Sequence, residues 1–206
     1  MEEEMRREDI PLYALESGDP VNQFDFIGFT LQYELSYTNV LNMLELAGIP
    51  LRSADRHELF NIVVGGGPCV CNPEPLADFF DIFFLGDGEE VDIEVMELYR
   101  QCKKEGKSKL EFLEQAAQIE GVYVPAFYEV TYNEDGTVKA YTPTHGAPAT
   151  IKKRVIRDMD KAYYPKDFVV PLIDVVHNRI SEEVLRGCIR GCRFCQAGYA
   201  LSLIHI

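Results

Sequence analysis

Two short apolar runs that end in glycine constrain the fold of this chain more than any other feature. They are NIVVGGG at 61–67 and DIFFLG at 81–86, and both have the length and composition of buried strands. A β-prone run precedes them at 22–31, and the pattern over 33–47 places apolar residues on one helical face. The motif DGEE opens a further helix after the third run. Strands and helices in this alternation predict a parallel α/β sheet.

The predicted architecture over 20–105 is part of a Rossmann-like, doubly wound parallel sheet, with a short helix at 73–80 between the second and third strands. In such sheets, ligands bind beyond the carboxyl ends of the strands. Two glycine-containing turns lie at that edge. They supply the candidate cofactor-binding residues, which are Gly65, Gly66, Gly67, Gly86, Asp87, Gly88 and Glu89.

The pattern changes after a helix predicted at 108–119. The segment VYVPAFYEVTYNEDGTVKAYTP at 122–143 contains two β-prone runs joined by Glu134, Asp135 and Gly136, which is a hairpin signal. A polar connector follows at 151–167, and its basic residues are interpreted as a solvated face.

The composition indicates the class of protein, the partners that its charge disfavours and the compartment in which we expect it. The 206 residues are 47% hydrophobic and carry a net charge of −14, which is the profile of a soluble globular chain. This charge disfavours general binding to nucleic-acid backbones or anionic lipid. No apolar run approaches the roughly 20 residues that a membrane-spanning helix needs. We therefore expect a cytoplasmic protein with no membrane partner.

Three of the six cysteines lie close together in the string RGCIRGCRFCQAGY. Cys188, Cys192 and Cys195 are separated by three and then two residues, and thiolates are the preferred ligands of iron–sulfur clusters. Three ligands leave one iron of a 4Fe-4S cluster open, as catalytic metal sites do. A zinc site, or a closed cluster with a fourth cysteine from elsewhere, remains an alternative. The other cysteines are interpreted as free thiols: Cys69, Cys71 and Cys102.

The cysteine loop resembles that of the radical S-adenosylmethionine (SAM) superfamily, in which an aromatic residue, here Phe194, precedes the last cysteine. The strings FDFIGFTLQYELSYTNVLNMLELAGIPLR, GGGPCVCNPEPLADFFD and FLGDGEE resemble one branch of it, which has an N-terminal cobalamin-binding-type domain. The resemblance extends nearly to Ala200, and the chain resembles a fragment of such proteins that is truncated at both ends.

The resemblance implies that Cys188, Cys192 and Cys195 hold a 4Fe-4S cluster and that Phe194 lies beside the adenine of SAM. The open iron would chelate SAM, and electron transfer would cleave it to methionine and a 5'-deoxyadenosyl radical. The implied partners are an electron donor such as flavodoxin or ferredoxin and an unidentified substrate. Cobalamin is implied only by the branch and the glycine turns, because no Asp-x-His-x-x-Gly motif is present. His57 lacks that spacing and is expected on a surface helix.

The chain therefore divides into four expected segments. Residues 1–105 are a partial cobalamin-binding-type Rossmann-like domain, and 106–165 are a connector with a helix and a hairpin. Residues 166–200 begin a radical SAM domain with the first strand and cluster loop of a partial β/α barrel. The last residues, LSLIHI at 201–206, resemble translated read-through of a sequencing adapter and are not expected to belong to the fold.

Two other classes of function stay open. The chain could be a non-catalytic iron–sulfur or metal-binding module with a degenerate Rossmann-like domain. It could also be an interaction protein with a structural cluster, whose sheet binds a macromolecule. Formation of methionine and 5'-deoxyadenosine by the complete protein would separate an enzyme from both. The fragment alone is expected to be inactive, because most of the barrel is missing.

Overall fold

A computed structural model describes residues 1–165, 167, 171–174, 176, 183 and 186–195. The chain forms two compact units, Met1–Arg154 and Val155–Ile206. The predicted strand and lead-in before the cysteine loop fall largely outside the described residues, as does the whole of 201–206. None of the helices in the described part has the length and apolar character needed to cross a membrane.

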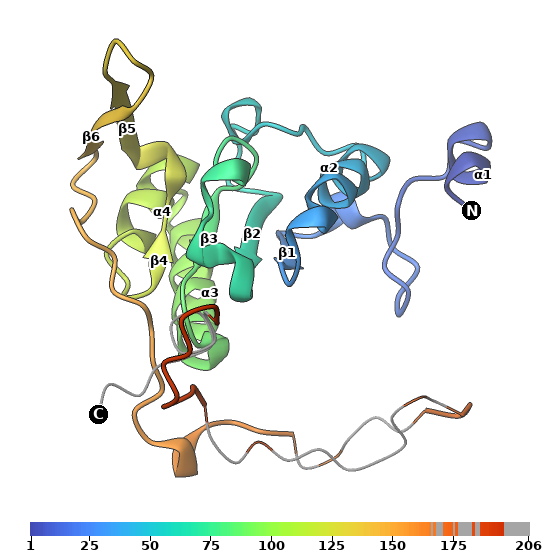
Figure 1. Cartoon of the computed structure of the whole chain (residues 1–206). Helices are drawn as coiled ribbons and strands as arrows, with labels where there is room; N and C mark the ends of the chain where they lie inside the picture. Colours follow the sequence, from blue (N-terminus) through green and yellow to red (C-terminus); the bar gives the residue numbers. More distant parts are fainter. Residues whose placement is uncertain (166, 168–170, 175, 177–182, 184–185, 196–206) are drawn as a thin grey trace. The chain divides into compact units, whose positions relative to one another are not determined.

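The first unit is built on a four-stranded sheet with the order β1-β2-β3-β4 (Figure 1). Its strands are β1 (Phe26–Thr30), β2 (Ile62–Gly66), β3 (Ile82–Phe84) and β4 (Val122–Tyr123). The first three run parallel, and β4 pairs antiparallel with β3. The prediction of an α/β fold with a mostly parallel sheet is confirmed, whereas the doubly wound strand order stays a prediction.

Helices cover both faces of this sheet. Neighbouring residues of a strand point to opposite faces, and apolar residues on both faces must be buried. Ile62 packs in a core with α3 (Gly88–Glu105) and α4 (Lys109–Ala116). Val63, the next residue, packs in a second core with α2 (Tyr37–Leu46). The strands are therefore apolar on both faces, as their continuous apolar runs predicted.

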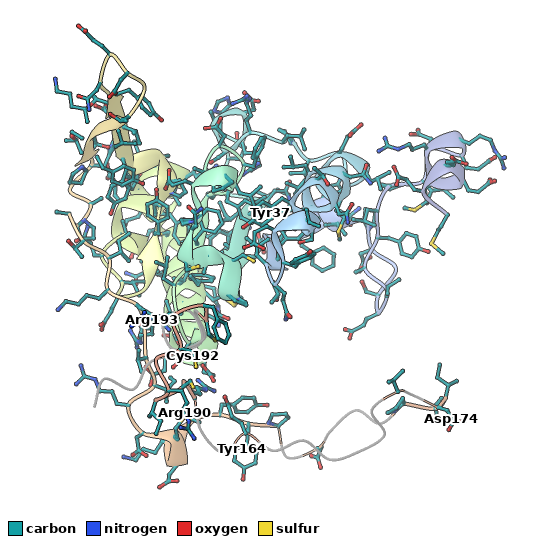
Figure 2. The ribbon with its side chains drawn as sticks, viewed as in Figure 1. Tyr37, Tyr164, Asp174, Arg190, Cys192 and Arg193 are labelled. Carbon is teal, nitrogen blue, oxygen red and sulfur yellow. The ribbon has the colours of Figure 1, made fainter. Side chains whose placement is uncertain are left out.

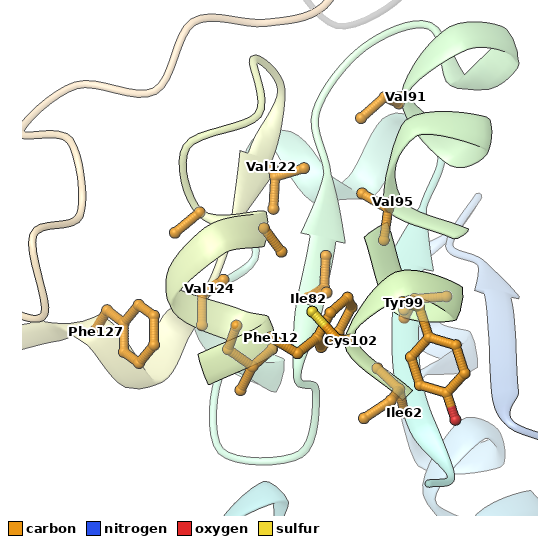
Figure 3. Packing of buried hydrophobic residues seen from close by; sticks show 14 of the residues in the cluster. Ile62, Ile82, Val91, Val95, Tyr99, Cys102, Phe112, Val122, Val124 and Phe127 are labelled. Carbon is orange, nitrogen blue, oxygen red and sulfur yellow. The ribbon is translucent and has the colours of Figure 1, made fainter. Parts of the chain in front are cut away.

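The core beneath α3 and α4 is continuous from the sheet to both helices (Figure 3). Ile82, Val91, Phe112 and Val122 are each at most 1% exposed and belong to this one cluster. Residues on both sides of the expected boundary at 105 thus share a core, and the division into 1–105 and 106–165 stays a prediction.

Prolines account for two differences from the expected elements. The helix expected at 73–80 is only a 3-10 turn, Glu74–Leu76, with Pro73 before it and Pro75 within it. Pro125 begins another 3-10 turn, which divides the first β-prone run of the expected hairpin. Val122 and Tyr123 before this turn join the main sheet, and only the residues after it enter the hairpin.

The hairpin itself consists of β5 (Tyr128–Tyr132) and β6 (Val138–Pro143), paired antiparallel. Gly136 takes a positive φ of 81° in its turn, which confirms the turn read from the sequence. The other elements are the helix α1 (Glu2–Arg7) and short 3-10 turns, including Met159–Lys161 in the second unit.

Candidate functional site

The described part of the cysteine loop, 186–195, carries its thiols on the surface. Cys188, Cys192 and Cys195 are exposed and form no disulfide. Gly187 and Gly191 have positive φ values of 89° and 61°, which glycine adopts at little cost and which bend the chain around the cysteines. The N–H of Cys195 donates to the carbonyl of Cys192 at 3.1 Å. The loop is therefore a tight turn with accessible sulfur atoms.

The thiols do not form a preassembled metal site. Among the described residues, no group of three or more His, Cys, Asp or Glu side chains is placed to hold a metal ion. Phe194 is 93% exposed. Figure 2 marks Cys192 together with Arg190 and Arg193, both exposed arginines of the same loop. Three accessible sulfur donors beside two cations are a chemically suitable donor set for an anionic iron–sulfur cluster.

The glycines at the carboxyl edge of the sheet mostly make room for the chain's own atoms. A methyl group on Gly65 would lie 2.7 Å from the Phe83 ring. Gly67 has a φ of +95°, and its methyl group would lie 2.9 Å from the carbonyl oxygen of Leu31. These two glycines are therefore explained by packing and backbone conformation.

Gly86 makes room for a segment that we call the strap, Lys153–Arg154. Its φ is +108°, and an added methyl group would lie 2.0 Å from the carbonyl oxygen of Arg154. The N–H of Arg154 donates to Leu85 at 2.8 Å, and the N–H of Asp87 donates back to Arg154 at 3.0 Å. The strap thus covers the turn between β3 and α3, where part of the ligand site was predicted.

The side chain of Arg154 fixes the strap to α3. Its guanidinium lies 2.7 Å from Glu90 and 2.6 Å from Glu94, and the side chain is only 16% exposed. Asp87 begins α3 as its N-cap residue without a side-chain capping bond. Lys153 is half-buried, and burial lowers the pKa of its ammonium group, while Asp87 acts in the opposite direction.

One pocket remains open at this edge, a slot of about 460 Å³ between α3 and the sheet. Its lining includes Gly28 of β1, Gly66 of β2 and Met96 of α3. Buried Val64 and Val95 lie at its inner end, whereas Gly28 and Met96 are exposed and mark its mouth. Four of the predicted residues contribute to this lining: Gly66, Gly67, Gly86 and Gly88. Their role in cofactor binding stays a prediction.

Asp92 is a polar side chain of the slot that the sequence pattern did not single out. It is half-buried, and a methyl group on Gly88 would lie 3.2 Å from its Oδ2. Burial, followed by repulsion from Glu89, raises the pKa of this carboxyl group. Within the described part of the chain, its carboxylate has no hydrogen-bond or ion-pair partner.

A buried ion cluster lies at the opposite edge of the sheet, before β3. The carboxylate of Asp81 accepts from Arg56 at 2.9 Å, from Lys109 at 2.6 Å and from the N–H of Val63 at 2.8 Å. It also accepts from the hydroxyl of Ser53. The side chains of Asp81, Arg56 and Lys109 are at most 8% exposed.

All donors of this cluster are engaged inside the protein. Arg56 also donates to the carbonyls of Pro50, Leu51 and Phe79, and Lys109 donates to the carbonyl of Arg56. No donor is left for a ligand, so the cluster ties loops to the sheet and does not form an anion site. Sequence reasoning missed it because its members are far apart in the chain.

The hairpin is attached to the sheet by a second group that sequence reasoning missed. Glu74 accepts hydrogen bonds from Tyr123 of β4 at 2.5 Å and from Tyr141 of β6 at 2.9 Å. Burial raises the pKa of Tyr141 to about 12. His57, expected on a helix, is exposed in an irregular segment near this group, in a larger pocket of about 700 Å³ that Glu74 also lines.

Comparison with known proteins places the chain in a family. Residues 1–125 match the model of the N-terminal region of radical SAM proteins. An uncharacterized protein of Methanocaldococcus jannaschii is 30% identical over 197 residues, which is 92% of this chain and 34% of that protein. The chain thus spans about a third of this relative. No solved structure matches the chain. The chain therefore belongs to the radical SAM proteins.

Proposed function

We propose that the complete protein is a radical SAM enzyme whose 4Fe-4S cluster is held by Cys188, Cys192 and Cys195. The observation that carries the proposal is the spacing of three accessible thiols in one glycine-bent loop of a chain from this family. The family match ends at residue 125, so the loop supports the proposal independently of that match.

In this proposal the cysteines, the arginines and the phenylalanine of the loop have different roles. The three thiolates would hold the cluster and leave one iron for SAM, and Arg190 and Arg193 would offset the negative charge of the thiolates. Phe194, now exposed, would cover the adenine of SAM and exclude water. When bound, the cluster would supply one electron, which cleaves SAM to methionine and a 5'-deoxyadenosyl radical. That electron would come from a donor such as flavodoxin or ferredoxin.

The residues at the carboxyl edge of the sheet do not fit a whole cobalamin. No histidine lines the slot among the described residues, and the strap covers the turn between β3 and α3. The slot of about 460 Å³ suits a drug-sized molecule. Cobalamin stays an implication of the branch, and no step of the proposed reaction passes through it.

The direct test is SAM cleavage by the complete protein under anaerobic, reducing conditions. We expect equal amounts of methionine and 5'-deoxyadenosine, and loss of both products in Cys192→Ala. Cys71→Ala is the matched control, because Cys71 is also exposed but lies outside the loop. A protein that binds iron and sulfide yet forms no 5'-deoxyadenosine would instead be a non-catalytic iron–sulfur module.

A further inference from the structure

The hydrogen bonds at the two ends of the hairpin fix which way the peptide groups of β5 point. The N–H of Thr144 donates to the carbonyl of Phe127 at 2.7 Å, and the N–H of Asn133 donates to the carbonyl of Thr137 at 2.8 Å. Peptide groups along an antiparallel strand point alternately to its two sides. The odd-numbered residues of β5 therefore direct their peptide groups toward β6, and the even-numbered residues direct theirs away from it.

Two residues leave a free edge on β5. The irregularity of the hairpin lies in β6, where Lys139 is the extra residue, so the alternation continues along β5. The N–H of Tyr128 donates to the carbonyl of Pro125. Within the described part of the chain, the outward peptide groups of Val130 and Tyr132 form no backbone hydrogen bond. An added strand could therefore pair with this edge.

The larger pocket, of about 700 Å³, lies beside this free edge and forms a groove between the hairpin and the rest of the first unit (Figure 1). All three even-numbered residues of β5 line it, and no residue of β6 does. Its other wall includes Phe79 from the loop before β3 and Leu110 of α4. Leu110 is 46% exposed and Tyr132 is 62% exposed. Apolar side chains and a free strand edge thus face the same groove.

The charged side chains that line the groove are balanced and engaged. They are Arg56, Glu74, Asp78 and Lys109. The two cations are paired with buried Asp81. Asp78 is paired with Arg52, and Glu74 accepts from two tyrosines. His57 also lines the groove and is exposed. The groove therefore offers no unpaired charge to a charged ligand, whereas β5 offers it free peptide groups.

We propose that this groove holds an extended segment of the complete protein, from outside the 206 residues, which pairs with β5 as an additional strand. Its peptide groups would bond to those of Val130 and Tyr132, and its apolar side chains would contact Phe79 and Leu110. Strand addition of this kind obtains affinity from main-chain hydrogen bonds and specificity from pockets for alternate side chains.

Two observations favour a segment of the same protein as the occupant. The chain spans about a third of its relative, so most of such a protein is available to supply the segment. A tethered segment also has a high effective concentration and needs no attraction between charges, which suits a groove of balanced charge. A second copy is disfavoured, because each copy carries a net charge of −14.

The test is residue-resolved hydrogen exchange in the complete protein and in the 206-residue chain. We expect the amides of Val130 and Tyr132 to exchange at least about tenfold more slowly in the complete protein. The amides of Glu129 and Thr131, which face β6, should be protected in both and serve as the internal reference. Equal rates at Val130 and Tyr132 in the two proteins would overturn the proposal.

Two variants of the complete protein test the contacts. Leu110→Lys places a charge on the apolar wall and should abolish the added protection, whereas Ile93→Lys is the matched control, since Ile93 is exposed on α3 outside the groove. Val130→Pro removes an N–H that the hairpin does not use and should abolish the protection of Tyr132, whereas Val130→Thr should retain it. If Val130→Pro opens the hairpin, Leu110→Lys decides.

The remaining outcomes separate this proposal from its rivals and from the radical reaction. Full protection in Leu110→Lys would overturn it. Protection that appears in the 206-residue chain as its concentration rises would also overturn it, in favour of pairing between two copies. Cys192→Ala should leave the protection unchanged, because the groove requires neither the cluster nor SAM. Failure of the proposed function would therefore leave the groove assignment standing, and the converse also holds.

Discussion

Asp81 shows why individual residues of this protein are hard to interpret from sequence. Its partners Arg56 and Lys109 lie 25 and 28 positions away, so no local pattern connects them. Only the packing of the loop before β2 and the start of α4 against β3 brings the three charges together. The cysteine loop is the opposite case, because all three sulfur donors lie within one short string.

Asp81→Asn should destabilise the chain by about 3–5 kcal/mol, because it leaves two buried cations without their counter-ion. Urea denaturation of the 206-residue chain measures this loss. Asp78→Asn is the control, since its ion pair with Arg52 is exposed and should contribute at most about 1 kcal/mol. Equal effects of both variants would contradict the structural role of Asp81.

Asp25 gives the fold a pH dependence with a defined sign. Hydrogen bonds from Lys103 and then Tyr99 lower the pKa of its carboxyl group in the folded state. Such a group stabilises the fold above its unfolded pKa, and this contribution is lost as the pH falls through the folded pKa. The stabilisation should be small, because both charged side chains are about half exposed.

Asp25→Asn should therefore be less stable than the wild type near neutral pH, and the difference should shrink as the pH falls below about 4. Denaturation curves at a series of pH values check this expectation. A difference that is the same at acidic and neutral pH would contradict the assigned hydrogen bonds.

At the scale of elements, sequence patterns located the three parallel strands and the three longer helices, and the errors lie near prolines. The continuous apolar runs at β2 and β3 are typical of strands buried on both faces, and both were predicted correctly. The prediction of a helix at 73–80 was wrong, because Pro73 and Pro75 allow only a 3-10 turn. Residues 122–123 were predicted as part of the hairpin, but they pair antiparallel with β3, because Pro125 interrupts the β-prone run after them.

The attachment of the hairpin depends on the hydroxyl of Tyr141. Tyr141→Phe keeps the ring stacked on Tyr128, with 5.2 Å between centroids, but removes the hydrogen bond to Glu74. We expect a local loss of about 1 kcal/mol and faster hydrogen exchange in β5 and β6, with β1 to β3 unchanged. Tyr132→Phe, on the same hairpin, should have no such effect, since this hydroxyl has no partner among the described residues.

Gly86 and Gly66 should respond differently to substitution, because Gly86 lies against the strap and Gly66 lines the slot. Gly86→Ala forces a side chain into a position with φ of +108° and against the main chain of Arg154. It should destabilise the fold by more than about 1 kcal/mol. Gly66→Ala should be neutral or slightly stabilising, because the new methyl group meets open space. Thermal unfolding of both variants measures the contrast, and similar melting temperatures would contradict the assignment of the strap.

At the scale of the whole molecule, the sequence predicted the α/β class and the family, and the family match and the sheet support both. It could not predict that the chain's own strap covers one of the two glycine turns, because Gly86 and Arg154 are distant in sequence. A glycine needed for close packing and one needed for a ligand give the same signal in sequence. The roles of the cysteines stay predictions, since the thiols in the described part of the chain are accessible but are not placed together to hold a metal ion.

The most direct test of the central claim is the iron and sulfide content of the complete protein after anaerobic reconstitution. We predict roughly four irons and four sulfides for the loop site, lost in Cys188→Ala, Cys192→Ala and Cys195→Ala and retained in Cys71→Ala. Retention of the full iron and sulfide content in the loop variants would contradict the account.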